Sequence, residues 1–332
     1  LFPPFPEYGM NVAKDARPPV AAHDDGGNDI LGAIAERDGV YVEGFSFLPY
    51  EGFAEEHAIV LDLGDLSRAE RVLLLLHGWT HYVTSSGLNA ATGDGVPPML
   101  PRLDAVDEEG NWVPIAMDMG FPAGQAKTMT YDLTGRFPTD DYRVRITTNL
   151  QIFWDQVLVS TFVDSGTPRV TELETLSGDL HWKGYPLLLA APGPRGFYPA
   201  DYDYDVVATD RDRWVVPEGN YTKYGDVTPL LADVDDMYVI MRHGDELTLE
   251  FDADTLPDLP AGWSRSLVFY LDGFLKYMDP YVAHASSVGP LPFHSMSGYP
   301  YPPEEAYPAD EAHLRYLEEY NTRRVTGGSA PD

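Results

Sequence analysis

The 332-residue sequence contains no cysteine. This absence excludes disulfides, thiol nucleophiles, iron–sulfur clusters, c-type haem attachment and zinc sites with thiolate ligands. It leaves the redox compartment open, because a protein without thiols is compatible with both oxidising and reducing surroundings.

Basic residues are scarce. The chain has 22 Lys and Arg against 53 Asp and Glu, for a formal net charge of -31. Nucleic acid is a poor partner for such a chain, since phosphate binding depends on clustered Lys and Arg that release counterions. An anionic membrane surface is disfavoured for the same reason. The acidity itself has three explanations that stay open: solubility, adaptation to high salt, or a surface that binds or steers cations.

Long apolar runs are also missing. The longest stretch, Val72 to Leu76, is far shorter than the roughly 18 to 20 residues of a membrane span, so we expect no direct span. The first residues, LFPPFPEYG, contain neither an initiator Met nor a signal peptide. We therefore expect a processed or trimmed N-terminus, which favours export to an extracytoplasmic location.

The sequence carries none of the common catalytic or nucleotide-binding motifs. The nucleophile elbow G-x-S-x-G is absent, the nearest stretch being HSMSG, and neither G-x-G-x-x-G nor GxxxxGK[ST] occurs. His77 and His81 stand four residues apart without an HExxH motif, so a metal role for them is disfavoured. A dispersed triad or a carboxylate pair cannot be identified among 53 acidic residues. We predict no catalytic residues.

Residues 41–165 have the pattern of short strands separated by turns. Apolar or alternating segments end repeatedly in Gly, Asn, Asp or Thr, which is typical of a sandwich or barrel. In RVRIT, Val144 and Ile146 are expected on one face of their strand. The predicted strands cover residues 58–63, 71–76, 128–133, 143–147 and 151–160. We predict an all-β protein whose centre is a jelly-roll-like β-sandwich.

The rest of the chain is divided by composition. Residues 1–40 are rich in Pro, Gly and Asp and predict an extended N-terminal arm, and residues 166–225 predict an irregular Pro, Gly and Tyr-rich connection. Residues 226–289 predict a second β region, with a hairpin around His243 to Asp245 and a further strand in SLVFYLDGF. Residues 290–332 are a Pro and Tyr-rich tail, with one short helix from Asp310, its N-cap, to about Tyr320.

Several phrases resemble the C-terminal region of large secreted bacterial proteins, where that region follows FG-GAP and ASPIC-type propellers or TPR repeats. They are HGWTHYVTSSGLNAA, GNWVPIAMDMGFPAGQAKTMTYDLTG, TTNLQIFWDQVLVS, GDVTPLLADVDDMYVIMRHGDELTLEFDA and FHSMSGYPYPPEEAYP. The order of the first three is also similar to galactose-binding jelly rolls of the discoidin type. The resemblance implies export and a β-sandwich, but no catalytic residues.

This chain departs from that pattern in two places. The propeller or repeat is not in this sequence, and GFLKYMDPY stands after Asp272 where a Trp and a DxD-like pattern are expected. A loop-borne site at that position is therefore in doubt.

Trp79, Tyr82 and Asn89 are the first candidate binding residues. They fall in a predicted loop together with Ser85 and Ser86, and flat aromatic faces beside small polar groups suit sugar stacking or a protein hot spot. Trp112 and Trp154 lie in predicted strands, where core packing is the simpler interpretation.

Tyr299, Tyr301 and Tyr307 are the second candidates. They stand among six prolines in the tail, so this extended segment could dock a partner chain. The alternative is a belt that wraps over its own domain.

Asp201, Asp203 and Asp205 are candidate calcium ligands, because hard cations prefer several carboxylate oxygens. The run fits an EF-hand loop poorly. On a strand the three acids would share one face with Tyr202 and Tyr204 on the other, so a solvated acidic edge is the alternative.

The sequence thus favours a non-catalytic, extracytoplasmic interaction or assembly protein that binds a protein partner or forms a homo-oligomer. A carbohydrate-binding module that takes a glycan is the first alternative, and a glycoside hydrolase-type enzyme is the second.

Overall fold

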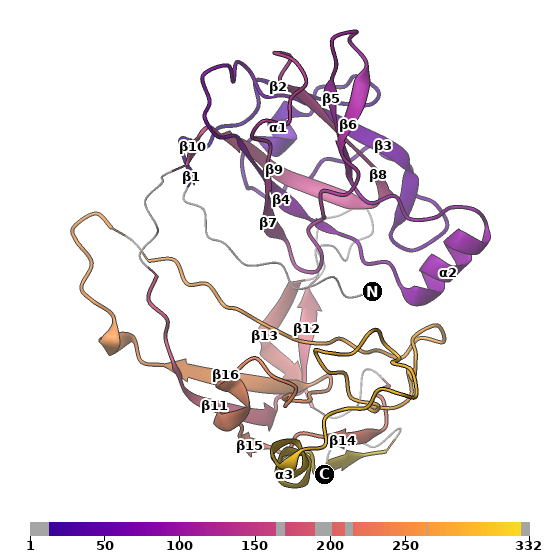
Figure 1. Cartoon of the computed structure of the whole chain (residues 1–332), viewed down its shortest axis with the longest axis vertical. Helices are drawn as coiled ribbons and strands as arrows, with labels where there is room; N and C mark the ends of the chain where they lie inside the picture. The colour runs from indigo at the N-terminus through magenta and orange to yellow at the C-terminus, as the bar shows by residue number, and fades with distance from the viewer. Residues whose placement is uncertain (1–12, 164–169, 190–200, 210–214, 264, 327–332) are drawn as a thin grey trace. The chain divides into compact units, whose positions relative to one another are not determined.

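The computed structural model describes residues 13–163, 170–189, 201–209, 215–263 and 265–326. The chain divides into two compact units (Figure 1). We call Tyr8–Pro168 with Ala190–Asp201 the N-terminal unit, and Leu1–Glu7, Arg169–Leu189 and Tyr202–Asp332 the C-terminal unit.

The N-terminal unit consists mainly of antiparallel strands. Its elements are β1 (Ala13–Lys14), β2 (Ala21–Asp24), α1 (Leu31–Ile34), β3 (Phe53–Asp62), β4 (Leu73–Thr80), α2 (Ser85–Gly93), β5 (Arg102–Val106), β6 (Trp112–Ala116), β7 (Lys127–Asp132), β8 (Arg143–Leu150), β9 (Ile152–Ser160) and β10 (Phe162–Val163). All five strands predicted between residues 58 and 160 are present, with boundaries that differ by a few residues. Residues 21–24, expected in an extended arm, form β2.

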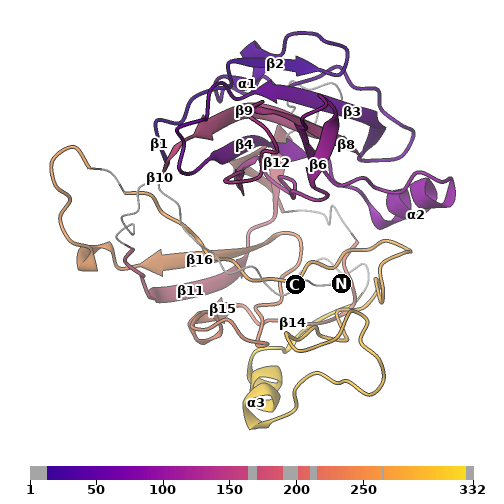
Figure 2. The same cartoon turned by 45° about the horizontal axis from the view of Figure 1, so that its top comes forward.

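These strands form two main sheets, which can be followed in Figures 1 and 2. One has the order β2-β3-β8-β5-β6 and the other β7-β4-β9. β1 and β10 form a small pair of their own. The register between β3 and β8 places Ile59 opposite Ile146 and Leu61 opposite Val144. Val144 and Ile146 are both buried, as the alternation predicted.

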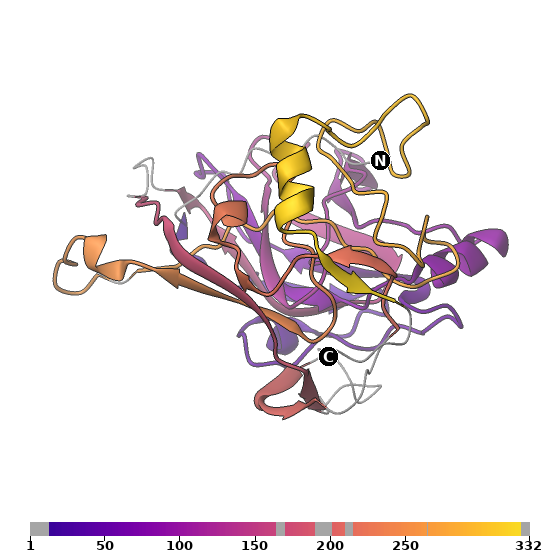
Figure 3. The ribbon, with the colours of Figure 1, turned by 90° about the horizontal axis from the view of Figure 1, so that it is seen from below.

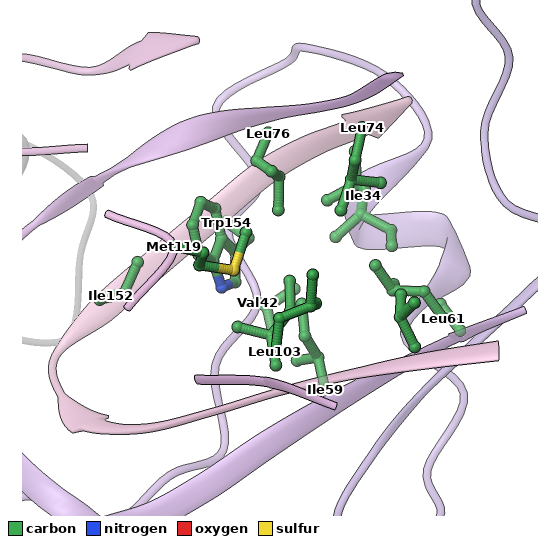
Figure 4. Close-up of a cluster of buried hydrophobic side chains, with 14 of the residues drawn as sticks. Ile34, Val42, Ile59, Leu61, Leu74, Leu76, Leu103, Met119, Ile152 and Trp154 are labelled. Atoms are coloured by element: carbon green, nitrogen blue, oxygen red, sulfur yellow. The ribbon is translucent and has the colours of Figure 1, made fainter. Parts of the chain in front are cut away.

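One continuous core lies between the two sheets. Figure 4 shows Leu74, Leu76, Ile152 and Trp154 on one side, facing Ile59, Leu61 and Leu103 on the other. β4 and β9 contribute the first group, and β3 and β5 contribute the second. One face of each sheet lies against this core, so its apolar side chains are removed from water, which stabilises the pair of layers. Trp154 is buried, as predicted, whereas Trp112 is half-buried and covers the Arg145 guanidinium at 5.0 Å.

The C-terminal unit has shorter elements. They are β11 (Thr175–Trp182), β12 (Tyr185–Leu189), β13 (Asp201–Ala208), β14 (Gly219–Tyr221), β15 (Gly225–Asp226), η1 (Thr228–Leu231), β16 (Asp245–Phe251), η2 (Ala253–Thr255), α3 (Glu311–Glu319) and β17 (Arg323–Val325). They form a three-stranded sheet, β15-β11-β16, and two pairs, β12-β13 and β14-β17.

The prediction of a hairpin around His243 to Asp245 is wrong, because its first strand is absent. β16 begins at Asp245 but pairs with β11, with Trp182 opposite Asp245 and Leu180 opposite Leu247. Residues 237–242 form no strand; instead the Thr222 N–H donates to the Ile240 carbonyl at 3.1 Å. β16 thus pairs with β11, which is distant in the sequence, and not with the neighbouring segment that was predicted. Hydrophobic periodicity does not show which strand a segment pairs with.

The strand predicted in SLVFYLDGF is also absent. The structure assigns neither strand nor helix to residues 265–278. By contrast, the predicted helix is confirmed: α3 starts after Asp310, whose carboxylate accepts the N–H groups of Ala312 at 3.0 Å and His313 at 3.2 Å.

Strands dominate both units, so the all-β prediction is confirmed, with two short helices added. α2 was not predicted because it is short and buries only Ala91. It begins where the Thr84 hydroxyl accepts the Gly87 N–H at 3.0 Å. Across the described residues, no helix has the length and apolar character that a bilayer crossing requires.

Candidate functional site

Trp79 lies in a strand, not in the predicted loop. It belongs to β4, opposite Phe153 of β9, and only 2% of it is exposed. The two rings stack with centroids 4.5 Å apart and planes 10° from parallel. Burying this large aromatic pair between strands removes more apolar area from water than a loop position would. Because the indole is buried, it offers no face on which a sugar could stack.

Tyr82 and Asn89 remain accessible. Tyr82 follows β4 and is 57% exposed, and Asn89 lies on the exposed side of α2. Without the Trp79 face, the predicted combination of two aromatic platforms beside an amide does not form.

The acidic run lies on strand β13, as the period-2 interpretation requires. The Oδ1 atom of Asp203 accepts the Asp205 N–H at 3.0 Å, and Tyr204 is exposed. The side chain of Asp201 lies outside the described residues, so the calcium site stays a prediction. Elsewhere in the described ranges, no three His, Asp or Glu side chains are placed to hold a metal ion.

Tyr299 and Tyr301 pack against their own unit. The Tyr299 hydroxyl donates to the Pro290 carbonyl at 2.9 Å and accepts from Lys276 Nζ at 2.9 Å. The Tyr301 ring lies edge-on to Phe293, with centroids 5.0 Å apart. Burial raises the pKa of Tyr299 to about 12, so its hydroxyl stays a donor at physiological pH.

Tyr307 attaches the tail to the unit by both a hydrogen bond and packing. Its hydroxyl donates to the Asp236 carbonyl at 2.5 Å, and its ring packs against the small core formed by Leu180, Val227, Leu230 and Tyr316. Burial also raises the pKa of Tyr307. The contacts of all three tyrosines favour the belt interpretation of the tail.

The tail nevertheless borders a groove of about 610 Å³, within the size range of small-molecule sites. Its lining comes from parts of the C-terminal unit that are distant in sequence: residues 218–220 and 286–291, Tyr301 and Tyr307 of the tail, and Leu317, Asn321 and Arg324. Figure 3 shows two of the contributing elements, α3 as the yellow helix and β17 as the yellow strand after it.

A second feature is an exposed run of large apolar side chains after β16. We define the apolar strip as Leu267, Val268, Phe269, Leu271 and Leu275, which are between 62% and 83% exposed. Scattered exposed apolar residues are ordinary, but a run of this kind usually marks an interaction surface. The sequence identified the run as a strand; only the structure shows that this unit leaves it uncovered.

His294 connects the apolar strip to the rest of the unit. Its Nε2 lies 3.0 Å from Asp272 Oδ2, directly after Leu271, and its Nδ1 lies 2.6 Å from Asp236 Oδ1. Tyr238 lies parallel to the imidazole, with ring centroids 6.4 Å apart. The hydrogen bond to Asp272, with that to Asp236, raises the pKa of His294 against the opposing effect of burial.

His294 belongs to no motif that can be identified in the sequence. Its partners stand 58 and 22 residues away, so no local motif reveals the cluster. Both ring nitrogens are occupied by carboxylates, which suits a structural tie between segments.

Comparison with known proteins gives no further assignment: no protein-family model, no curated protein and no solved structure matches this chain.

Proposed function

We propose that this chain is a non-catalytic interaction or assembly protein of an extracytoplasmic complex, and that the apolar strip is its contact surface for another protein. The observation that carries the proposal is the exposure of the strip, at least 62% for each of its five side chains. Covering such side chains removes apolar area from water, at about 25 cal/mol per Å².

The strip also differs in charge from the rest of the molecule. Residues 263–278 contain two basic residues, Arg265 and Lys276, and one acidic residue, Asp272, in a chain of net charge -31. A second copy of the chain would bring another strongly acidic body close to the first, which like-charge repulsion opposes. The favoured occupant is therefore a different protein with a neutral or basic apolar surface.

The extracytoplasmic location is supported by the sequence resemblance to exported proteins. The jelly-roll connectivity of the N-terminal unit belongs to the same proposal, and the two antiparallel sheets around one core support it.

The test compares two matched charge substitutions of exposed apolar residues. Leu271→Asp alters the strip at an 82% exposed side chain, whereas Met117→Asp alters a 69% exposed side chain of the N-terminal unit. Tagged wild-type chain and both variants are used as baits in the envelope and secreted fractions of the source cells. Since an unpaired charge in an apolar interface is costly, we expect Leu271→Asp to retain at least about tenfold less of the specific partner, with Met117→Asp unchanged.

Two outcomes contradict the proposal. Equal retention by all three baits would mean that the strip is not the contact. A concentration-dependent dimer in sedimentation equilibrium, abolished by Leu271→Asp, would replace the different partner with a second copy of this chain.

A further inference from the structure

β16 is an edge strand of the sheet β15-β11-β16. It pairs with β11 from Asp245 to Phe251, and within the described residues no other strand pairs with it (Figure 1). An edge strand presents main-chain N–H and C=O groups with which a strand of another chain can pair. The free side of β16 is therefore a surface on which a partner could add a strand.

The register shows which main-chain groups of β16 lie on that free side. The Lys183 N–H donates to the Gly244 carbonyl at 2.9 Å, and antiparallel strands bond to each other through every second residue. The N–H and C=O groups of Leu247 and Leu249 therefore point away from β11. Across the described part of the chain, these groups have no main-chain partner.

The apolar strip lies beside the apolar face of β16. Because side chains alternate along a strand, Leu247, Leu249 and Phe251 share one face. The Phe251 ring lies edge-on to Phe269 of the strip, with centroids 6.0 Å apart. An added strand would therefore meet apolar side chains on this face, both from β16 and from the strip.

The opposite face of β16 is acidic. It carries Glu246, Thr248 and Glu250, and Glu246 lies 3.3 Å from His181 Nε2. Glu250 is exposed and accepts from the Ser177 hydroxyl at 2.8 Å, but it has no cationic partner among the described residues. Opposite charges on neighbouring strands stabilise a sheet, so this face favours Lys or Arg in an added strand.

We propose that the partner binds by strand addition: an extended segment, apolar and basic at alternate positions, pairs with the free edge of β16. Main-chain hydrogen bonds to Leu247 and Leu249 hold the segment. Its apolar side chains lie against Phe251 and Phe269, and its basic side chains lie beside Glu250. This inference rests on the proposed function, because it specifies the chemistry of the protein that covers the apolar strip.

The first test is isothermal titration calorimetry of the full chain with a peptide of alternating Val and Lys, about eight residues long. Salt at about 0.15 M limits long-range attraction to the acidic chain. The matched control peptide has the same composition and charge, with its Val and Lys residues in two blocks. We expect saturable binding of the alternating peptide and at least about tenfold weaker binding of the block peptide, which cannot separate apolar and basic side chains onto opposite faces.

The second test blocks the free edge of β16. Leu249→Pro removes an N–H that points away from β11, a position at which an edge strand tolerates proline. Leu249→Val keeps this N–H and has a side chain of similar size. We expect Leu249→Pro to bind the alternating peptide at least about tenfold more weakly than Leu249→Val does. Circular dichroism verifies that both variants are folded, and the two peptides decide the test if Leu249→Pro is not.

Equal affinity for the two peptides, or no saturable binding up to about 1 mM, would overturn the proposal. Equal affinity of the two Leu249 variants for the alternating peptide would overturn it as well. Using Leu249→Pro as a further bait in the envelope and secreted fractions separates this inference from the proposed function. If Leu271→Asp loses the cellular partner while Leu249→Pro retains it, the strip is the contact surface but strand addition is wrong.

Discussion

In the N-terminal unit, side chains from two sheets bury one another along a single continuous core, which includes residues as large as Trp154. The described residues of the C-terminal unit form two small buried clusters, one around Leu180 and Tyr316 and one around Tyr221 and Val325. It also leaves the apolar strip exposed. Similar local patterns of apolar residues have thus led to burial in one unit and to exposure in the other.

Polar contacts compensate for part of this difference in the C-terminal unit. The buried carboxylate of Asp245 accepts from Arg323 Nη2 at 2.6 Å and from the Tyr224 hydroxyl at 2.8 Å. The Arg323 guanidinium also lies 4.1 Å from the centroid of the Tyr224 ring. Desolvation of both charges offsets much of the attraction within a buried ion pair, so its net stabilisation is modest. Removing one partner would nevertheless leave the other buried and unpaired, which is costly.

The largest expected effect contrasts one large apolar residue from each unit. Trp154→Ala should lower the free energy of unfolding of the N-terminal unit by about 3 to 5 kcal/mol, since it leaves a cavity in a closed core. Phe269→Ala, at a side chain that is 62% exposed, should change stability by less than about 0.5 kcal/mol. Chemical denaturation followed by tryptophan fluorescence and circular dichroism measures both. A large loss of stability in Phe269→Ala would show that the strip is covered within the chain.

A smaller effect is expected at Gly244, where a side chain of the C-terminal unit leaves no room for a Cβ atom. Gly244 has φ +89°, and a Cβ there would lie 2.3 Å from the Trp182 ring. Gly244→Ala should therefore destabilise this unit by about 2 to 4 kcal/mol. Gly262 has a similar φ of +83° but no neighbour within 4 Å, so Gly262→Ala should cost only about 1 to 2 kcal/mol. If thermal melts show equal losses of stability in the two variants, contact with the Trp182 ring does not contribute to the destabilisation.

The smallest effect concerns pH. The pKa of His294 is raised, so its stabilising pairing with Asp272 and Asp236 is complete below the unfolded-state value of about 6.5 and is lost as pH rises through the higher folded-state value. The free energy of unfolding of the C-terminal unit should therefore fall as pH rises above about 6.5, by an amount on the order of 1 kcal/mol, which thermal melts at a series of pH values measure. His294→Gln should flatten this dependence. If stability depends on pH in the same way in wild type and in His294→Gln, the ion pairs of His294 with Asp272 and Asp236 do not contribute to it.

Sequence patterns predicted the strands of the N-terminal unit well, because its apolar or alternating segments are separated by turns that contain Gly, Asn and Asp. Val144 and Ile146 show this directly: period-2 spacing assigned both to one face, and both are buried. The same reasoning misplaced Trp79, because the Gly78 beside it indicated a turn, whereas the strand continues to Thr80. It also missed the His294 tie, whose partners Asp236 and Asp272 lie 58 and 22 residues away along the chain.

The sequence by itself determined the all-β class, the exclusion of thiol chemistry, the poor suitability for nucleic acid, and the capped helix after Asp310. Those properties follow from composition and from contacts between near neighbours. Only the tertiary structure decided which apolar segments find a partner. Val144 and Ile146 of β8 are buried in the core between the two sheets, whereas the strip from Leu267 to Leu275, equally strand-like in sequence, stays exposed. Burial depends on surfaces brought together from distant positions, and local periodicity contains no information about whether such a surface is present.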